Sequence, residues 1–300
     1  MNEEKVRELK FLLKTYDALN RAIVSTKNRL TSMNPDAKHE HDWLLNGWKT
    51  GKTKYHGLEN IKGRVSRQIE KCLQYWDIWN AWLKDVPGCG PHCAGNLIVL
   101  YYYRFVPICK KCGADLVEFE CPEHGKAKGD GVLNFRIEER EHQNVGKWWA
   151  HLGLHNDEEG KKPKRQAGKK SNWSNIGRQI SWALGEGFIK SKNEYYKHYL
   201  EKKAEYERTR PDWTKAHRSN AAANVAVKLF QSHFWHVART IEGKPTINPY
   251  VQDILGHSNI VPPYYWDNNQ KNVEIQLPDV SHYCSEIQKP GVNHCRCEIQ

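Results

Sequence analysis

The stretch VPGCGPHCAGNL, from Val86 to Leu97, decides which fold we expect for the chain. Gly88 and Gly90 alternate with apolar residues, and an apolar run follows them. Glycine tolerates positive φ angles and lets another backbone approach closely, because it has no Cβ atom. A helix that begins after Gly90 would expose the unpaired N–H groups of its first turn. The stretch therefore predicts a tight turn that leads directly into a buried helix.

Such a turn suits a phosphate group, because unpaired N–H groups and the positive end of the helix dipole face the same way. The order apolar, Pro, Gly, apolar, Gly resembles the helix-hairpin-helix motif, which holds a DNA backbone without reading bases. In this interpretation Gly88 and Gly90 form the hairpin, and the amides of Gly90, His92 and Cys93 face the phosphate. The alternative is an ordinary glycine turn between two helices. The apolar segments on both sides favour the motif.

The composition is that of a basic globular protein. Of 300 residues, 39% are hydrophobic and 27% are charged, so the chain can bury a sizeable core. The formal net charge of +11 favours an anionic partner, with nucleic acid first and an anionic membrane surface second. No uninterrupted apolar run reaches the roughly 18 residues that a membrane span needs.

The first residues, MNEEKVRELK, are charged and lack the apolar core of a signal peptide. The nine cysteines include two closely spaced pairs, which is typical of metal binding in a reducing compartment rather than of a disulfide framework. We therefore expect a cytoplasmic protein without a membrane partner, associated with the nucleoid of a prokaryote or with a virus-infected cell.

Apolar residues at helical spacing predict a mainly α fold. Two long helices, over residues 3–31 and about 57–83, are joined by a polar connection at 32–53. They predict an antiparallel helical hairpin or coiled coil, which could pair with a second copy of the chain. Further helices are expected at about 174–190, 192–209 and 214–241.

We divide the chain into an N-terminal helical hairpin, a helix-hairpin-helix core, a small zinc-knuckle insert and an extended C-terminal tail. These parts cover residues 1–85, 86–106 together with 132–244, 107–131, and 245–300. The tail is assigned as extended because it is rich in Pro and Asn and has no helical stripe.

Cys109-x-x-Cys112 and Cys121-x-x-His124 have the spacing of two metal-binding knuckles, separated by eight residues. Together they supply four ligands of the kind that Zn²⁺ binds in a tetrahedron, and a closed set of four is typical of a structural site. A glycine follows the second ligand of each pair, where such a turn commonly needs a free φ angle. Four unrelated surface residues are the alternative. A second, less regular group occurs in the tail: Cys284, His294, Cys295 and Cys297.

The segment FRIEEREHQ, from Phe135 to Gln143, carries several carboxylates that could bind Mg²⁺. They alternate with arginines, however, which favours a salt-bridged, solvated helix face over a metal site.

Two longer segments, VPGCGPHCAGNLIVLYYYRF and VGKWWAHLGLHNDEEGKKPKRQAGKKSNWSNIGRQISWALGEGFIKSKNEYYKHYLEKK, occur in a recognisable order. They resemble the C-terminal domain of the bridge-RNA-guided insertion-sequence transposases of bacteria and archaea. Within residues 60–265, the matching features are Gly153-Leu154, the basic loop at 160–172, Asn175 to Arg178, and Tyr195, Tyr196 and Tyr199. AAANVAVKLFQSHFWHVART and INPYVQDILGHSNIVPP are similar to the tail of archaeal members.

The resemblance implies a domain that binds DNA or structured RNA through the hairpin and the basic loop. The residues expected to contact nucleic acid are Gly88, Gly90, His92, Lys161, Lys162, Lys164, Arg165, Lys169, Lys170 and Arg178.

The chain departs from this family in two places. The helical N-terminal part does not resemble the family's RuvC-like nuclease domain, and LHNDEEGKKPK stands where the family places its nucleophilic serine. Ser171 and Ser174 come later and are the remaining catalytic candidates. We therefore expect a DNA-binding relative without its own nuclease activity. The alternatives are an active serine-type recombinase or transposase, and a zinc-stabilised protein that assembles through its N-terminal helices.

Overall fold

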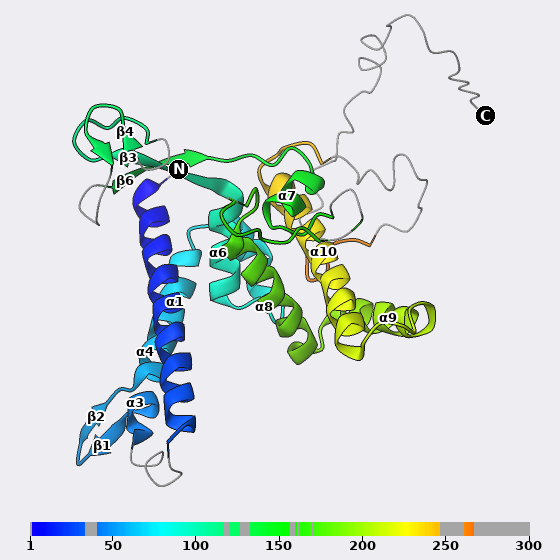
Figure 1. The fold of residues 1–300 in the computed structure, drawn as a ribbon, viewed down its shortest axis with the longest axis horizontal. Helices are drawn as coiled ribbons and strands as arrows, with labels where there is room; N and C mark the ends of the chain where they lie inside the picture. Colours follow the sequence, from blue (N-terminus) through cyan, green and yellow to red (C-terminus); the bar gives the residue numbers. More distant parts are fainter. Residues whose placement is uncertain are drawn as a thin grey trace, which may run out of the picture. The chain divides into compact units, whose positions relative to one another are not determined.

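The computed structural model describes residues 2–33, 41–116, 120–126, 133–156, 160, 162–169, 171–246 and 261–266. These residues are mainly helical, as the apolar spacing predicts (Figure 1). Residues 1–266 form one unit by their contacts, and 267–300 lie outside the described part. Within the described ranges, none of the helices combines the length and apolar character that crossing a lipid bilayer requires.

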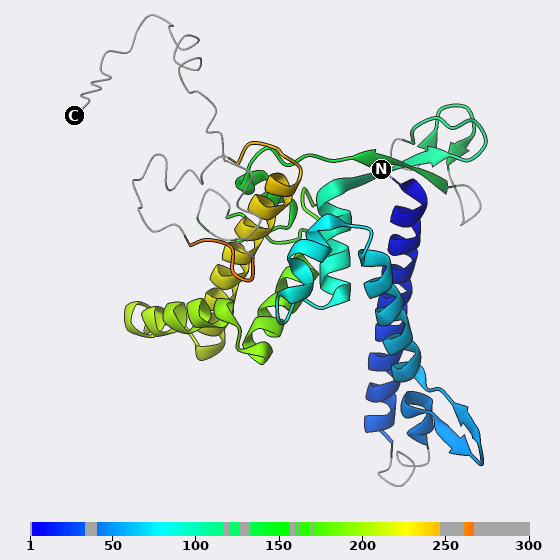
Figure 2. The same cartoon turned by 180° about the vertical axis from the view of Figure 1, so that it is seen from behind.

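Two antiparallel helices form the N-terminal hairpin, α1 (Glu3–Thr31) and α4 (Leu58–Leu73), which lie side by side in both views (Figure 1 and Figure 2). Lys27 Nζ pairs with Glu59 at 2.7 Å near one end of the pair. The thiol of Cys72 lies 3.9 Å from the carbonyl oxygen of Lys5 near the other. Leu9 and other apolar residues of the α1 stripe are buried between the helices and the rest of the core. The prediction for residues 3–31 is confirmed.

The prediction of one helix over 57–83 is wrong. The chain leaves the helix after Leu73, adopts an extended backbone at Trp76, and continues as α5 (Asp77–Ala81) and a 3₁₀ turn (Leu83–Asp85). The side-chain amide of Asn80 donates to the carbonyl of Gln74 at 2.7 Å, which helps to terminate α4. Trp76 and Leu83 are both buried, as their spacing suggests, but they reach the core from separate elements.

The connection at 32–53 also contains structure that the sequence did not predict. Its described part holds a short helix, α3 (Trp43–Asn46), and two antiparallel strands, β1 (Trp48–Thr50) and β2 (Thr53–Tyr55). Gly47, with φ +75°, and Gly57 bring their backbones together at the base of this hairpin. A Cβ atom on Gly47 would overlap the carbonyl oxygen of Tyr55 and lie 2.7 Å from the nitrogen of Gly57.

The core is built on α6 (Pro91–Tyr102), which is apolar on nearly all sides and follows the glycine turn. Around it pack α7 (Val145–His151), α8 (Asn175–Ser191), α9 (Glu194–Thr209) and α10 (Lys215–Ile241). The last three agree with the predicted helices within a few residues. The interior is strongly aromatic: Trp82 stacks on Phe230 and Trp148 on Phe234, with centroids 5.4 and 5.7 Å apart.

The insert is carried on a two-stranded ribbon, β3 (Tyr103–Cys109) paired antiparallel with β6 (Leu133–Glu139). Beyond the ribbon, β4 (Glu120–Cys121) and β5 (Gly125–Lys126) form a second, smaller hairpin. Arg7 of α1 donates to the carbonyl of Phe135 at 2.9 Å, so the ribbon is attached to the start of the N-terminal helix.

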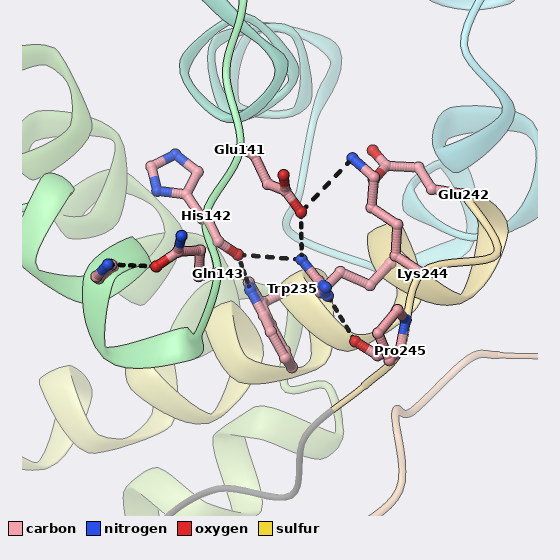
Figure 3. A network of polar contacts seen from close by, with 9 residues as sticks. Glu141, His142, Gln143, Trp235, Glu242, Lys244 and Pro245 are labelled. Atoms are coloured by element: carbon pink, nitrogen blue, oxygen red, sulfur yellow. Dashed lines mark hydrogen bonds and ion pairs between the residues drawn. The ribbon is translucent and has the colours of Figure 1, made fainter. Parts of the chain in front are cut away.

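The segment FRIEEREHQ is therefore strand and linker, not a helix face. Its carboxylates do form ion pairs, as predicted, and Arg136 binds Glu138 at 2.8 Å. In the linker, Glu141 and the carbonyl of His142 accept from Arg239 of α10 (Figure 3). Trp235 donates to that same carbonyl at 2.8 Å, so the linker is tied to the C-terminal end of α10.

Candidate metal centre and nucleic-acid interface

The four predicted metal ligands lie together. The metal-binding atoms of Cys109, Cys112, Cys121 and His124 are all within 4.8 Å of one another, so this group could hold a metal ion. Cys109 ends β3, Cys121 ends β4, and the other two lie in the turns that follow. His124 Nδ1 is 3.7 Å from the sulfur of Cys109 and 3.6 Å from that of Cys121, and the sulfurs of Cys112 and Cys121 are 3.6 Å apart.

The backbone of the first knuckle is suited to a thiolate. The N–H groups of Cys112 and Lys111 point at the Cys109 sulfur and lower the pKa of that thiol to about 6. The N–H of Ala114 lowers the pKa of Cys112, but desolvation and the neighbouring thiols of Cys121 and Cys109 outweigh it and raise that pKa to about 11. The cluster therefore favours one thiolate first, and a cation would be needed to stabilise the others.

Both knuckle glycines have the backbone conformation that the sequence predicts. Gly113 has φ +75° and Gly125 has φ +68°, in the left-handed region that side chains disfavour. The Gly113 N–H donates to the carbonyl of Cys109 at 2.8 Å, which closes the first turn.

The two glycines of the hairpin before α6, Gly88 and Gly90, have different surroundings. Gly88 has φ +88° and packs on α8, where a Cβ atom would lie 2.7 Å from the carbonyl carbon of Gly187. The Cys89 N–H is already bonded to the carbonyl of Val86 at 3.1 Å. Gly90 is different: it is exposed, has φ −67°, and no atom lies within 4 Å of the position of a Cβ. Gly88 is therefore structural, and Gly90 leaves an open surface.

The first turn of α6 has unpaired donors at this surface. Within the described part of the chain, no acceptor contacts the N–H groups of Gly90, His92 or Cys93, and the first intrahelical bond is made by Ala94 to Gly90 at 3.0 Å. The imidazole of His92, by contrast, is engaged: Nε2 lies 2.8 Å from a carboxylate oxygen of Asp17, and the ring stacks on that of Tyr16. His92 can therefore offer its backbone rather than its side chain.

The basic loop contributes to a second cationic surface. Burial, together with the charges of Arg178 on α8 and Lys228 on α10, lowers the pKa of Lys162 to about 8. Arg178 donates to the carbonyl of Pro163 at 2.8 Å, which attaches the loop to the start of α8. Arg178 and Lys228 both lie near enough to repel the charge of Lys162, a cost that an anion would relieve. Lys164, Arg165 and Lys169 are exposed; Lys161 and Lys170 lie outside the described residues.

Both candidate serines make local structural contacts. Ser174 caps α8, since its Oγ accepts from the Gly177 N–H at 3.0 Å. The hydroxyl of Ser171 donates to the carbonyl of Trp173 at 3.2 Å. The tail residues Cys284, His294, Cys295 and Cys297 lie outside the described part of the chain.

The sequence did not single out Lys228 or the exposed aromatic residues. Lys228 lies on α10, far along the chain from the basic loop, and only folding brings its charge near Lys162. Trp182 on α8 is 67% exposed, and the exposed Gln179 three residues earlier lies on the same solvent face of that helix. A helical wheel of α8 would have found this face.

Comparisons of the chain with protein-family models, with curated proteins and with solved structures found no match.

Proposed function

We propose that this chain binds nucleic acid by the sugar-phosphate backbone, through the first turn of α6 and the basic surface around Lys162. The observation that carries the proposal is the open position at Gly90, beside the unpaired N–H groups of His92 and Cys93. A phosphate oxygen accepts from such donors and is stabilised by the helix dipole. The resemblance to the transposase domain supports the same surface.

The basic surface around Lys162 would contribute electrostatic attraction to the phosphates. Lys162, Arg178 and Lys228 come from three different elements, and the net charge of the chain is +11. Contacts of this kind position a nucleic acid without reading its bases. We therefore expect weak sequence preference and affinity that falls steeply with salt.

The direct test is fluorescence anisotropy with labelled DNA and RNA duplexes, titrated with the full chain at several salt concentrations. The affinity should fall linearly on a log–log plot, and each phosphate contact should contribute about 0.9 to the slope for DNA. Lys162→Ala should lower the slope by about that amount. Lys215→Ala, which removes an exposed lysine at the start of α10, is the control. Absence of binding at low salt would exclude the proposal.

We further propose that Cys109, Cys112, Cys121 and His124 bind a structural Zn²⁺ ion. With Zn–S bonds of about 2.3 Å and Zn–N bonds of about 2.0 Å, the donors of a tetrahedral site lie about 3.5–3.8 Å apart. Three of the six donor separations, from 3.6 to 3.7 Å, fall within that range, and all six are within 4.8 Å. Since all four positions would be filled by protein, the ion would hold the insert together rather than activate water.

Native mass spectrometry of the chain purified without added metal tests the zinc site. Cys109→Ser should lose one zinc ion relative to the wild type, and Cys72→Ser, a buried thiol on α4, should lose none. A second ion that persists in Cys109→Ser and disappears in Cys284→Ser would support the tail site. The same zinc content in Cys109→Ser and in the wild type would contradict the first site.

A further inference from the structure

The β1–β2 hairpin is exposed on both faces. All six of its strand residues are solvent-exposed, so neither face packs on a core. Its register places Trp48 opposite Tyr55 on one face and Lys49 opposite Lys54 on the other. Figure 2 shows the hairpin beside the lower end of the α1–α4 pair, seen from behind. An isolated two-stranded hairpin is only marginally stable in water. A hairpin whose side chains are all exposed therefore calls for a functional explanation.

One face carries a stack of aromatic rings. Trp48 and Tyr55 are nearly parallel, with centroids 4.2 Å apart and an angle of 9° between the rings. Trp43 of α3 meets the edge of Trp48 at 5.1 Å. All three side chains remain between 43% and 44% exposed. The stack stabilises the hairpin and also presents flat aromatic surface to solvent.

The other face carries unpaired positive charge. Lys49 and Lys54 lie directly opposite each other, an arrangement of like charges that destabilises a strand pair. Lys52, in the turn, adds a third cation. Within the described residues no acidic group pairs with any of these lysines, and Asp42 is the one acid in the sequence from 41 to 56.

The neighbouring helices leave this charge uncompensated. Glu59, at the start of α4, is held by Lys27 at 2.7 Å and by Lys62 at 3.1 Å. On the next turn of α4, Arg64 contacts the ring nitrogen Nε2 of His56 at 2.6 Å. Desolvation lowers the pKa of His56, and the positive charge of Arg64 lowers it further. The region is therefore basic and aromatic at once.

We propose that the β1–β2 hairpin binds an unpaired strand of nucleic acid, with bases stacked on the Trp48–Tyr55 face and phosphates contacted by Lys49, Lys52 and Lys54. With aromatic rings on one face and lysines on the other, the hairpin offers both elements of single-strand recognition, because every base has a flat face and every linkage a charge. A duplex covers its base faces by internal stacking, so it would use the lysines and leave the aromatic rings unused. This site is separate from the α6 surface and does not depend on it.

The test measures the affinity of the full chain for labelled unpaired oligothymidylate and for a duplex of equal length. Trp48→Ala should weaken binding of the unpaired strand by about fivefold or more, while Trp48→Phe, which keeps a ring, should retain most of it. Tyr75→Ala removes a 62% exposed aromatic residue after α4 and is the matched control. Lys49→Ala with Lys54→Ala should lower the salt slope for the unpaired strand by about 1.4.

The two sites give opposite results in the two assays. Trp48→Ala should leave duplex affinity unchanged, whereas Gly90→Asp should weaken duplex binding and leave the affinity for the unpaired strand unchanged. Equal affinity of Trp48→Ala and the wild type for the unpaired strand overturns the inference. A second result would also overturn it: the wild type self-associates, and Trp48→Ala makes the chain monomeric without changing its affinity for DNA. The hairpin would then be a surface that binds a second copy of the chain.

Discussion

Gly90 is the position where a single charge tests the phosphate site without disturbing the fold. It is the N-cap of α6, its φ of −67° and ψ of 169° suit any residue, and nothing lies within 4 Å of its Cβ position. Asp and Asn are both favoured N-caps and gain a few tenths of a kcal/mol over Gly. Gly90→Asp and Gly90→Asn should therefore fold at least as well as the wild type, and they differ only in charge.

The size of the effect follows from the geometry of the helix start. A carboxylate at the N-cap would lie about 5 Å from a phosphate bound at the same N–H groups. With an effective dielectric constant between about 20 and 80, the repulsion is about 0.8–3 kcal/mol, or roughly fourfold to 150-fold in affinity. The separation is shorter than the Debye length of about 10 Å at 0.1 M salt, so screening reduces this effect only in part.

The assay is fluorescence anisotropy with one duplex at low salt, and thermal unfolding of each variant is measured beside it. We expect Gly90→Asp to bind less tightly than Gly90→Asn, with similar unfolding temperatures. If the two variants bind the duplex equally well, no phosphate lies at the start of α6 and the reasoning fails. If Gly90→Asp is unstable, the N–H groups of this turn are not unpaired.

Four further outcomes are expected. Gly88→Ala should lower the free energy of unfolding by about 2–4 kcal/mol in urea melts, because its φ of +88° and its contact with Gly187 both exclude a side chain; an unchanged midpoint would contradict this packing. The pKa of Lys162 is lowered from 10.5 to about 8 by burial, so its charged form opposes folding below pH 8 and favours anion binding; duplex affinity should fall as pH rises from 7 to 9, and Lys162→Arg should remove that dependence. Chelation of the metal should accelerate hydrogen exchange at the Cys109 knuckle and leave the helices protected, whereas equal rates would exclude a structural ion. Asp17→Asn should strengthen duplex binding by about two- to fivefold, because it removes a negative charge beside the α6 turn; weaker binding would mean that the Asp17 contact shapes the site.

The sequence predicted those features that depend on local spacing. The helix over 3–31 follows from its apolar stripe, and the knuckle ligands follow from a two-residue spacing that a tight turn brings together. Features that depend on distant residues were not predictable. The partner of His92 is Asp17, 75 positions earlier, and the cation beside Lys162 comes from α10.

The errors in helix prediction also have physical causes. The apolar spacing of α4 continues to Trp76, although the backbone turns, because the next residues reach the same core from a new direction. The β1–β2 hairpin is short and has no buried face, so the alternation that usually marks a strand is missing. In FRIEEREHQ, charged residues hid the alternation of Phe135 and Ile137, which the pairing with β3 makes visible.

The backbone contact between Gly88 and Gly187 fixes one distance in the molecule. It joins the start of α6 to the last turns of α8, while Arg178 joins the basic loop to the first turn of the same helix. Nine residues of α8 separate the two attachment points, which corresponds to about 14 Å along its axis. The two surfaces that we propose bind phosphate, at the two ends of α8, are therefore held at a fixed separation. A nucleic acid that contacts both surfaces must have phosphates at this separation. The form of its double helix, A or B, would therefore matter more to recognition than the order of its bases.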